Sequence, residues 1–438
     1  MLGFDDSLDR AHPLDAADAF AAAHLRRNFT ALALDYGFFG LGMSLSSTAT
    51  VLPALANRLG ASNLILGALP NLILLGRALP ALFSARLIEP LPRKLPFVLT
   101  YTVWERLPWL ALAAAVYLLT NSNPGLVLAL LVGTLAAVAL VGGSLTPAWT
   151  DLVAKVIPTT YRGRFFAVGS AFSTGLGLLG ALFSGYLLLE YPFPVGYTLC
   201  LGATFLCLMA SYGSMAMARE PATGTDRRAL PLSLHLARLP RILGRNPSFA
   251  WYLGARALST LGMMSMAFYT VHALRSLDAQ EWNVAGFTFA MLAAQAAGGV
   301  ALGVLADHVG HRASLLVGAL AASAANALAL AAGDLLLFHG AFLLMGLSVA
   351  ATNVSSLTLV LELAEADERP LYLGVATAAQ GPFALFSPLL AAGLADALGL
   401  GAIFAVAGLL NGLSVALYLW RVEEPRHAPR LKNEDRTG

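Results

Sequence analysis

The sequence predicts an all-α membrane protein with twelve transmembrane helices in two pseudo-symmetric six-helix bundles. Of its residues, 58% are apolar and only 12% are charged, and the mean hydropathy is +0.70. A soluble domain carries about 25% charged residues, so this composition does not suit a water-exposed surface. Apolar stretches of roughly 20 residues, enough for one span, recur from end to end, and one polar stretch divides them six and six. This pattern excludes a separate soluble domain of useful size.

Twelve apolar segments define the predicted spans. Lipid offers no partner for backbone N–H and C=O groups, so each span is expected to be a helix. The spans are 29–54, 63–86, 95–119, 125–150, 165–189, 195–218, 248–274, 282–305, 313–332, 335–363, 371–395 and 399–420. The expected regions are a cytoplasmic N-terminal segment (1–28), an N-terminal bundle (29–218), a cytoplasmic central loop (219–247), a C-terminal bundle (248–420) and a cytoplasmic tail (421–438).

Basic residues fix the expected orientation, because cytoplasmic loops carry an excess of Lys and Arg. With both termini in the cytoplasm, 22 of the 27 basic residues lie inside and three lie within spans. The two outside are Arg58 and Arg275. One missed span would scramble this alternation, so the asymmetry also supports an even number of spans. We therefore expect an integral protein of the cell (plasma) membrane with both termini cytoplasmic.

The connections after the second and the eighth span carry related motifs. The later one, 303–312, reads GVLADHVGHR, and the earlier one, 85–94, reads ARLIEPLPRK. In both, an acidic residue is followed five residues later by a basic one. Basic residues also open the fifth and the eleventh span. The two halves of the chain therefore carry the marks of an internal repeat.

These motifs resemble those of the major facilitator superfamily, whose signature Gly-x-x-x-Asp-x-x-Gly-x-Arg is matched at 303–312. The earlier copy keeps its acid and its bases but has Ala85 and Pro92 in place of the glycines. The resemblance covers 29–420. It implies that charge pairs in these loops close one membrane face and break as the two halves rock. The alternative is that the charges only set topology and cap helix ends. The residues of this predicted cytoplasmic gate motif are Gly303, Asp307, Gly310, Arg312, Glu89, Arg93, Lys94, Arg162, Arg164 and Arg369.

Ionisable residues inside spans are rare, and they mark candidate functional sites. At about 1.5 Å per residue, five of them lie roughly 9–17 Å from the cytoplasmic face. The resemblance implies that the first, fourth, seventh and tenth spans line the central cavity, which makes Asp35 and Arg256 the main candidate pair. Asp35 is expected to be the coupling acid, the alternative being a fixed Asp–Arg tie between helices. The five residues are Asp35, Arg77, Glu105, Arg106 and Arg256.

The same layer of the membrane holds two acids and three arginines, and this excess of positive charge favours an anionic substrate. Neutral polar residues could complete the cavity, each with a helix–helix hydrogen bond as its alternative role. Asp151, at the end of the fourth span, is expected to pair with Arg162 or Arg164, and the adjacent Trp149 is expected to lie at the membrane interface. The neutral candidates are Asn71, Tyr269, His272, Gln295, Asn353 and Gln380, with Thr352, Ser355 and Ser356 around Asn353.

No P-loop and no metal-binding motif occurs in the sequence, so we expect no cofactor, no metal and no direct use of ATP. The leading hypothesis is a secondary active transporter of a small organic solute, a monomer coupled to protons, with the bilayer and its substrate as partners and no nucleic acid. Sodium is the alternative coupling ion. The rival hypotheses are a multidrug-type efflux pump for apolar or cationic compounds, an intramembrane transferase and a receptor that does not transport. The fifth span lacks the Gly-Pro signature of the family's drug antiporters, and His272 and His339 lack the acidic partner that an enzyme would need.

Overall fold

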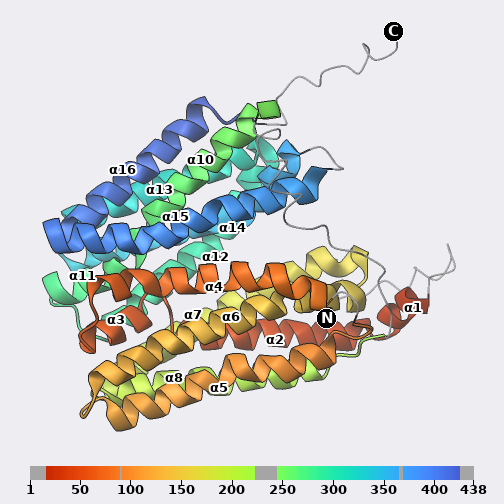
Figure 1. Cartoon of the computed structure of the whole chain (residues 1–438), viewed down its shortest axis with the longest axis horizontal. Helices are drawn as coiled ribbons and strands as arrows, with labels where there is room; N and C mark the ends of the chain where they lie inside the picture. The colour runs from red at the N-terminus through yellow and green to blue at the C-terminus, as the bar shows by residue number, and fades with distance from the viewer. Residues whose placement is uncertain (1–15, 89–90, 222–243, 365–367, 425–438) are drawn as a thin grey trace.

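The computed structural model describes residues 16–88, 91–221, 244–364 and 368–424, and every regular element in these ranges is a helix (Figure 1). The elements are α1 (Ala16–Ala23), α2 (Leu25–Leu45), α3 (Val51–Arg58), α4 (Asn63–Ile88), α5 (Leu95–Leu119), α6 (Pro124–Val156), α7 (Thr159–Glu190), α8 (Val195–Ala216), α10 (Pro247–Gly262), the 3₁₀ turn η2 (Met263–Ser265), α11 (Met266–Ser276), α12 (Asn283–Val309), α13 (His311–Ala331), α14 (Leu335–Leu363), α15 (Arg369–Leu398) and α16 (Leu400–Trp420). The all-α prediction is confirmed. Most of the predicted central loop and the end of the tail lie outside the described residues.

The helices are built to lie in lipid. Nine helical stretches of the described chain are long and apolar enough to cross a membrane: α6, α7, α8, α10 with α11, and α12 to α16. Their outer faces expose large apolar side chains, such as Leu206 at 67% and Leu336 at 82%. The other three predicted spans correspond to α2 with α3, α4 and α5, which carry Asp35, Arg77, Glu105 and Arg106. The count of twelve spans stays a prediction.

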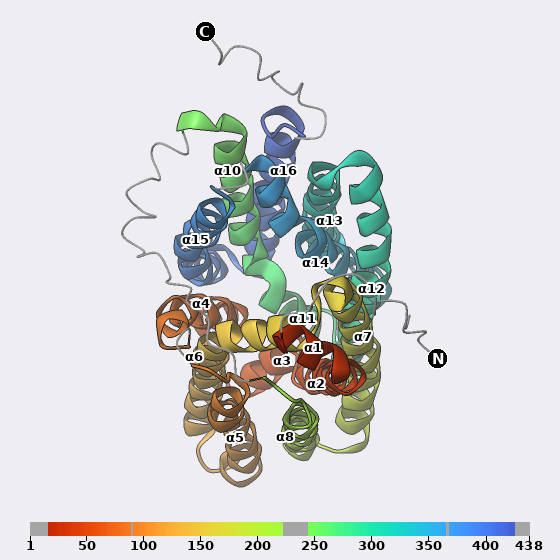
Figure 2. The same cartoon turned by 90° about the vertical axis from the view of Figure 1, so that its right-hand side faces the viewer.

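The helices form two bundles that lie side by side with their long axes roughly parallel (Figure 1). Helices α2 to α8 make one bundle and α10 to α16 the other, as the view along the axes shows (Figure 2). Across the boundary, α4 packs on α15, α7 packs on α12, and α3 and α11 contact each other. We call the side where α2 begins and α16 ends the terminal side, and the side with α3 the opposite side.

The first helix of each half is interrupted, whereas the sequence predicts unbroken spans at 29–54 and 248–274. In the first half α2 stops at Leu45, and the hydroxyl of Ser47 accepts from the backbone N–H of Ala49 at 3.3 Å. In the second half the break is η2, where Ser265 donates its hydroxyl to the carbonyl of Gly262 at 3.2 Å. Short hydroxyl side chains compete with helical backbone bonds in this way, which explains both breaks.

The two halves also share a cap that sequence reasoning missed. Glu220, which follows α8, accepts from the backbone N–H groups of Lys94 and Leu95 at 2.8 and 2.7 Å, where α5 begins. Glu424, which follows α16, accepts from the N–H of Arg312 at 3.0 Å, where α13 begins. Each carboxylate therefore satisfies free donors at a helix N-terminus, where negative charge is favoured. The signal in the sequence is a Glu-Pro pair after the last helix of each half, at 220–221 and 424–425.

Loss of either cap is expected to destabilise its bundle. Glu220→Gln and Glu424→Gln replace charge-assisted hydrogen bonds by weaker neutral ones, at a cost of about 1 kcal/mol each. Thermal unfolding of the purified protein in detergent measures this change. Glu423→Gln is the matched control, because Glu423 is the neighbour of Glu424 in the chain and its side chain is exposed. If the Glu424→Gln and Glu423→Gln variants had the same melting curve, the capping role of Glu424 would be contradicted.

Candidate functional site

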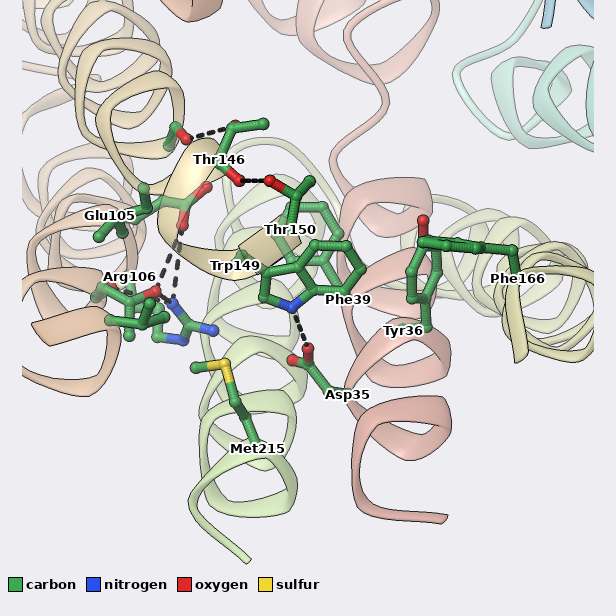
Figure 3. Close-up of a pocket in the computed structure, with 14 residues that line it drawn as sticks. Asp35, Tyr36, Phe39, Glu105, Arg106, Thr146, Trp149, Thr150, Phe166 and Met215 are labelled. Atoms are coloured by element: carbon green, nitrogen blue, oxygen red, sulfur yellow. Dashed lines mark hydrogen bonds and ion pairs between the residues drawn. The ribbon is translucent and has the colours of Figure 1, made fainter. Parts of the chain in front are cut away.

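A pocket of about 460 Å³ lies in the N-terminal bundle, between α2, α5, α6, α7 and α8 (Figure 3). It is lined by polar and charged side chains on one wall and by aromatic rings on the other. Asp35, which the sequence predicts as the coupling acid, lies in it together with Glu105 and Arg106. The lining residues are Asp35, Tyr36, Phe39, Val98, Thr102, Glu105, Arg106, Gly142, Leu145, Thr146, Trp149, Thr150, Phe166 and Met215.

Asp35 is almost fully buried, at 7% exposure, and its carboxylate is held on both oxygens. Ser211 of α8 donates its hydroxyl to Oδ1 at 2.6 Å. The indole N–H of Trp149, on α6, donates to Oδ2 at 3.3 Å, and Figure 3 shows the two side chains facing each other. Three helices therefore meet at this carboxylate. Trp149, predicted as an interfacial residue, lines the pocket with its ring and donates its N–H to the buried acid.

Arg106 crosses the floor of the same pocket at 2% exposure. It donates to the carbonyls of Leu208 and Thr102 at 2.8 and 2.9 Å and to the hydroxyl of Ser211 at 3.2 Å. Its guanidinium lies 3.7 Å from the carboxylate of Glu105. Ser211 thus accepts from Arg106 while it donates to Asp35. The result is one continuous chain of polar contacts that joins Asp35, Ser211, Arg106 and Glu105 across three helices.

Aromatic rings form the opposite wall of the pocket. The rings of Tyr36 and Trp149 meet edge to face at 5.4 Å, and Trp149 meets Phe166 at 6.5 Å. The hydroxyls of Thr146 and Thr150 are occupied by carbonyls of their own helix. A solute in this pocket would therefore meet flat apolar surface on one side and the Asp35–Arg106 network on the other.

Arg256 is placed on α10, in the C-terminal bundle. Its terminal nitrogens lie 3.3 Å from the hydroxyl of Thr352 and 3.3 Å from the side-chain oxygen of Gln380. The structure therefore gathers three predicted residues, from α10, α14 and α15. It does not bring Arg256 to Asp35, because every hydrogen bond of Asp35 stays within its own bundle.

The remaining predicted cavity residues divide into packed and open ones. Tyr269 is buried in an aromatic cluster, with ring centroids of Phe342 and Phe404 at 5.6 and 5.2 Å. Asn71 donates to the carbonyl of Gly67 in its own helix at 3.2 Å. Asn353 is exposed on α14, and Gln295 is half-buried on α12. The structure describes the backbone of Arg77 within α4 and gives no placement for its side chain.

Three further neutral candidates serve the C-terminal bundle. His272 lies on α11, with its ring 5.2 Å from Phe404. Ser355 lies 3.1 Å from the ring nitrogen of His311, and the carbonyl of Ser356 accepts from Tyr252 at 2.9 Å. The Ser355–His311 hydrogen bond and the Tyr252–Ser356 hydrogen bond join helices, whereas the ring nitrogen of His272 lies 3.3 Å from the hydroxyl of Ser276 in its own helix.

The predicted gate residues that the structure describes lie on the terminal side. Gly310 has a φ of +117°, and a Cβ there would come within 2.2 Å of the Glu424 carboxylate, so the position requires glycine. Arg312 donates to the carbonyls of Tyr418 and Leu419 at the end of α16, both at 2.6 Å. Arg312 therefore ties two helices of its own bundle.

The first-half motif is organised around a buried lysine. Lys94 is fully buried, donates to the carbonyls of Ile88 and Leu91 at 2.6 and 2.7 Å, and lies 3.6 Å from Asp151. Asp151 also lies 3.8 Å from Lys155. The prediction that Asp151 pairs with Arg162 or Arg164 is wrong, since nearer lysines take that place.

The other basic gate residues make local contacts or face outward. Arg162 binds carbonyls of Ala154 and Ile157, and Arg164 lies over the ring of Tyr161 at 5.9 Å. Gly303 lies within α12, and Glu89 lies outside the described residues. The remaining members, Arg93, Asp307 and Arg369, have exposed side chains.

In the part of the chain that the structure describes, the polar contacts between the two bundles lie on the opposite side. Arg58 forms an ion pair with Glu281. Arg275 donates to Asn57 at 2.8 Å, and Asn63 donates to Asp396 at 2.7 Å. Thr50 and Thr288 share a hydrogen bond, and Thr270 donates to the carbonyl of Ala49 at 3.3 Å. The bundles are therefore fastened to each other away from the termini.

Comparisons with known proteins agree with this arrangement. The sequence model of the Major Facilitator Superfamily matches residues 272–437. A D-xylose–proton symporter structure is similar with a TM-score of 0.67 and 14% identity, covering 93% of this chain and 99% of that one. The structure of a peptide transporter of the POT family is similar with a TM-score of 0.63 and 13% identity, covering 94% of this chain and 98% of that one. The inward-facing, unoccupied structure of a bacterial homologue of the human lysosomal transporter Spinster is similar with a TM-score of 0.59 and 16% identity. That match covers 94% of this chain and 96% of that one. No curated protein sequence matches the chain.

These findings confirm the predicted resemblance. The chain is an integral membrane protein with the fold of major facilitator superfamily transporters.

Proposed function

We propose that the protein is a secondary active transporter that moves a small organic solute by alternating access. The two bundles are fastened on the opposite side, by contacts such as Arg58–Glu281 and Asn63–Asp396. Only a few polar contacts have to separate there when one bundle rocks against the other. This rocking exchanges access between the two membrane faces. The fold shared with a D-xylose–proton symporter and a peptide transporter supports this function.

The observation that carries the proposal is the buried Asp35 in a pocket of ligand size. A volume of about 460 Å³ lies within the roughly 300–1,000 Å³ typical of small-molecule sites. Buried carboxylates in a membrane are costly and mark ion or proton pathways. Asp35 is tied to Arg106 through Ser211, so a proton on Asp35 changes the balance of charge across the whole polar chain. We propose that Asp35 takes up and releases the coupling proton.

We further propose that the solute carries an anionic group, which binds near Arg256. Arg256 carries a positive charge inside the membrane, and its hydrogen bonds go to the neutral groups Thr352 and Gln380 at 3.3 Å. A guanidinium with only long contacts to neutral acceptors attracts carboxylate or phosphate. Arg256→Gln is accordingly expected to abolish transport of the true substrate, and uptake equal to that of the parent would remove Arg256 from the site.

The orientation follows the distribution of basic residues. We propose that the terminal side faces the cytoplasm, that the protein acts as a monomer in the plasma membrane, and that the charged residues at the starts of α5 and α13 belong to its cytoplasmic gate. The caps by Glu220 and Glu424 support this role of the helix starts, because each one links the gate motif to the last helix of its bundle.

Uptake into proteoliposomes tests the proposal. Purified protein is reconstituted and offered radiolabelled sugars, carboxylates, amino acids, nucleosides and phosphates, with and without a pH gradient. We expect one class to accumulate, and to accumulate only when the gradient is present. Absence of uptake of every class, in protein shown to be folded by its melting curve, would contradict the transporter.

A second candidate, export of organic cations, is favoured by one observation. The N-terminal pocket holds two acids, Asp35 and Glu105, against the single Arg106, and it has an aromatic wall suited to cation–π contacts. Proton-driven export of a cationic dye from the same vesicles, with no uptake of anions, would select this function over the first.

A further inference from the structure

A second, smaller cavity lies inside the C-terminal bundle, at the place that corresponds to the N-terminal pocket. The large pocket is lined mainly from the first, third, fourth and sixth spans of its half (α2, α5, α6 and α8), with Phe166 of α7 added, and the small one lies between α10, α13, α14 and α16, which occupy the same four places in the second half. Its volume is about 30 Å³. A cavity needs roughly 10–15 Å³ to hold one water molecule, so this one has room for a monatomic ion or a very small polar group.

Two buried donors border this cavity without an acceptor. Nε of Arg256 is fully covered and makes no hydrogen bond, and the same is true of the hydroxyl of Tyr418. Both side chains line the cavity, and Tyr418 is only 1% exposed. An unsatisfied buried donor costs roughly 1–3 kcal/mol, more for a charged group. Two of them beside one cavity indicate that an acceptor occupies it.

The charge of Arg256 points to the kind of acceptor. In the N-terminal bundle, Asp35 is offset by Arg106 through Ser211. In the C-terminal bundle, Ala322 lines the cavity from the third span, as Arg106 does in the first half, and no carboxylate is among the lining residues that the structure describes. Arg256 is half-buried, with its Nε covered and its other hydrogen bonds going to the neutral groups Thr352 and Gln380, and a cation inside a membrane is costly without an anion beside it. The missing partner is therefore negative.

We propose that this cavity is a binding site for a small monovalent anion, held by Nε of Arg256 and the hydroxyl of Tyr418. Ser259 and Asn411 also line it and add polar surface. The cavity is small and is lined from four helices, which suits a halide or the carboxylate end of a solute. This site extends the proposal of an anionic solute made above. It rests on that proposed function only for the natural source of the anion.

Thermal unfolding of the full-length protein in detergent tests this site without any transport step. Sodium chloride, bromide, formate and acetate are each exchanged for sodium gluconate at constant sodium concentration. A ligand that binds the folded state raises the melting temperature. We expect a saturable rise for the parent, no rise for Arg256→Gln and a half-saturating concentration about tenfold higher for Tyr418→Phe, which loses one hydrogen bond to a charged group.

Two controls keep the test interpretable. Tyr269→Phe removes a buried hydroxyl of the same bundle that does not line the cavity, and it should respond to anions as the parent does. If Arg256→Gln fails to fold, Arg256→Lys is measured in its place. The lysine keeps the charge but not the Nε–H group, so its response to anions should be weakened.

The outcomes separate the sources of the anion. A rise with chloride and bromide assigns the site to a free halide, whereas a rise with formate and acetate alone assigns it to the carboxylate of a solute. No rise with any of the four, or an undiminished rise in Arg256→Gln, would overturn the site. Because binding is read without vesicles, such a failure is distinct from a failure of uptake.

Discussion

Replacing Asp35 with Asn is expected to abolish accumulation of the solute against its gradient while leaving exchange across the membrane intact. The amide keeps the shape of the carboxyl and still accepts a hydrogen bond from Ser211 or Trp149, but it takes up no proton. Coupling is then lost, and binding is retained. The measurement compares pH-driven uptake with solute counterflow in the same proteoliposomes.

The matched control is Asp278→Asn. Asp278 lies in an exposed loop with a φ of +49°, a conformation that Asn tolerates well, so this variant makes the same chemical change away from the pocket. It should accumulate solute as the parent does. Full accumulation by Asp35→Asn would show that the coupling proton is carried elsewhere.

Loss of Arg106 is expected to have the largest effect on stability. Arg106→Gln leaves Asp35 and Glu105 buried without their cation and frees the carbonyl of Leu208. Removing one partner of a buried charged network costs about 3–5 kcal/mol. The apparent melting temperature in detergent should fall by several degrees, and the fall should be smaller in a Glu105→Gln background, where one uncompensated acid is already gone.

Arg164→Gln serves as the comparison, since its exposed side chain only lies over the ring of Tyr161. Its unfolding should match that of the parent. Equal melting of the Arg106 and Arg164 variants would mean that the network contributes little to the fold, and the pocket would then have to be explained by its aromatic wall alone.

The lengths of the apolar stretches predict the fold well, because most of the spans are long and strongly apolar. The predicted spans 95–119 and 335–363 coincide with α5 and α14, and 399–420 begins one residue before α16. The breaks in the first and seventh spans were not predictable in this way, because they depend on which hydroxyl side chains turn back onto the backbone.

The candidate site was predicted only in part. Distance along a helix gives depth in the membrane but not the direction in which a side chain points, so Asp35 and Arg256 fall at similar depth yet each stays in its own bundle. Ser211 and Tyr418 carry no charge, and nothing in an apolar stretch distinguishes them from packing residues, while the place of Trp149 at the end of a span predicts only an interfacial residue. Only the folded chain shows that they border the buried charges.

A reversible lock across the two bundles tests the central claim most directly. Arg58→Cys and Glu281→Cys, in a background where Cys200 and Cys207 are replaced by Ala, place thiols at the ion pair that joins the bundles on the opposite side. A short, reducible thiol cross-linker should stop uptake into proteoliposomes, and reduction should restore it. Cross-linking Ser122→Cys to Leu126→Cys, exposed positions four residues apart where α6 begins within one bundle, should leave uptake unchanged. Uptake that continues through the locked 58–281 pair would contradict transport by rocking of the two halves.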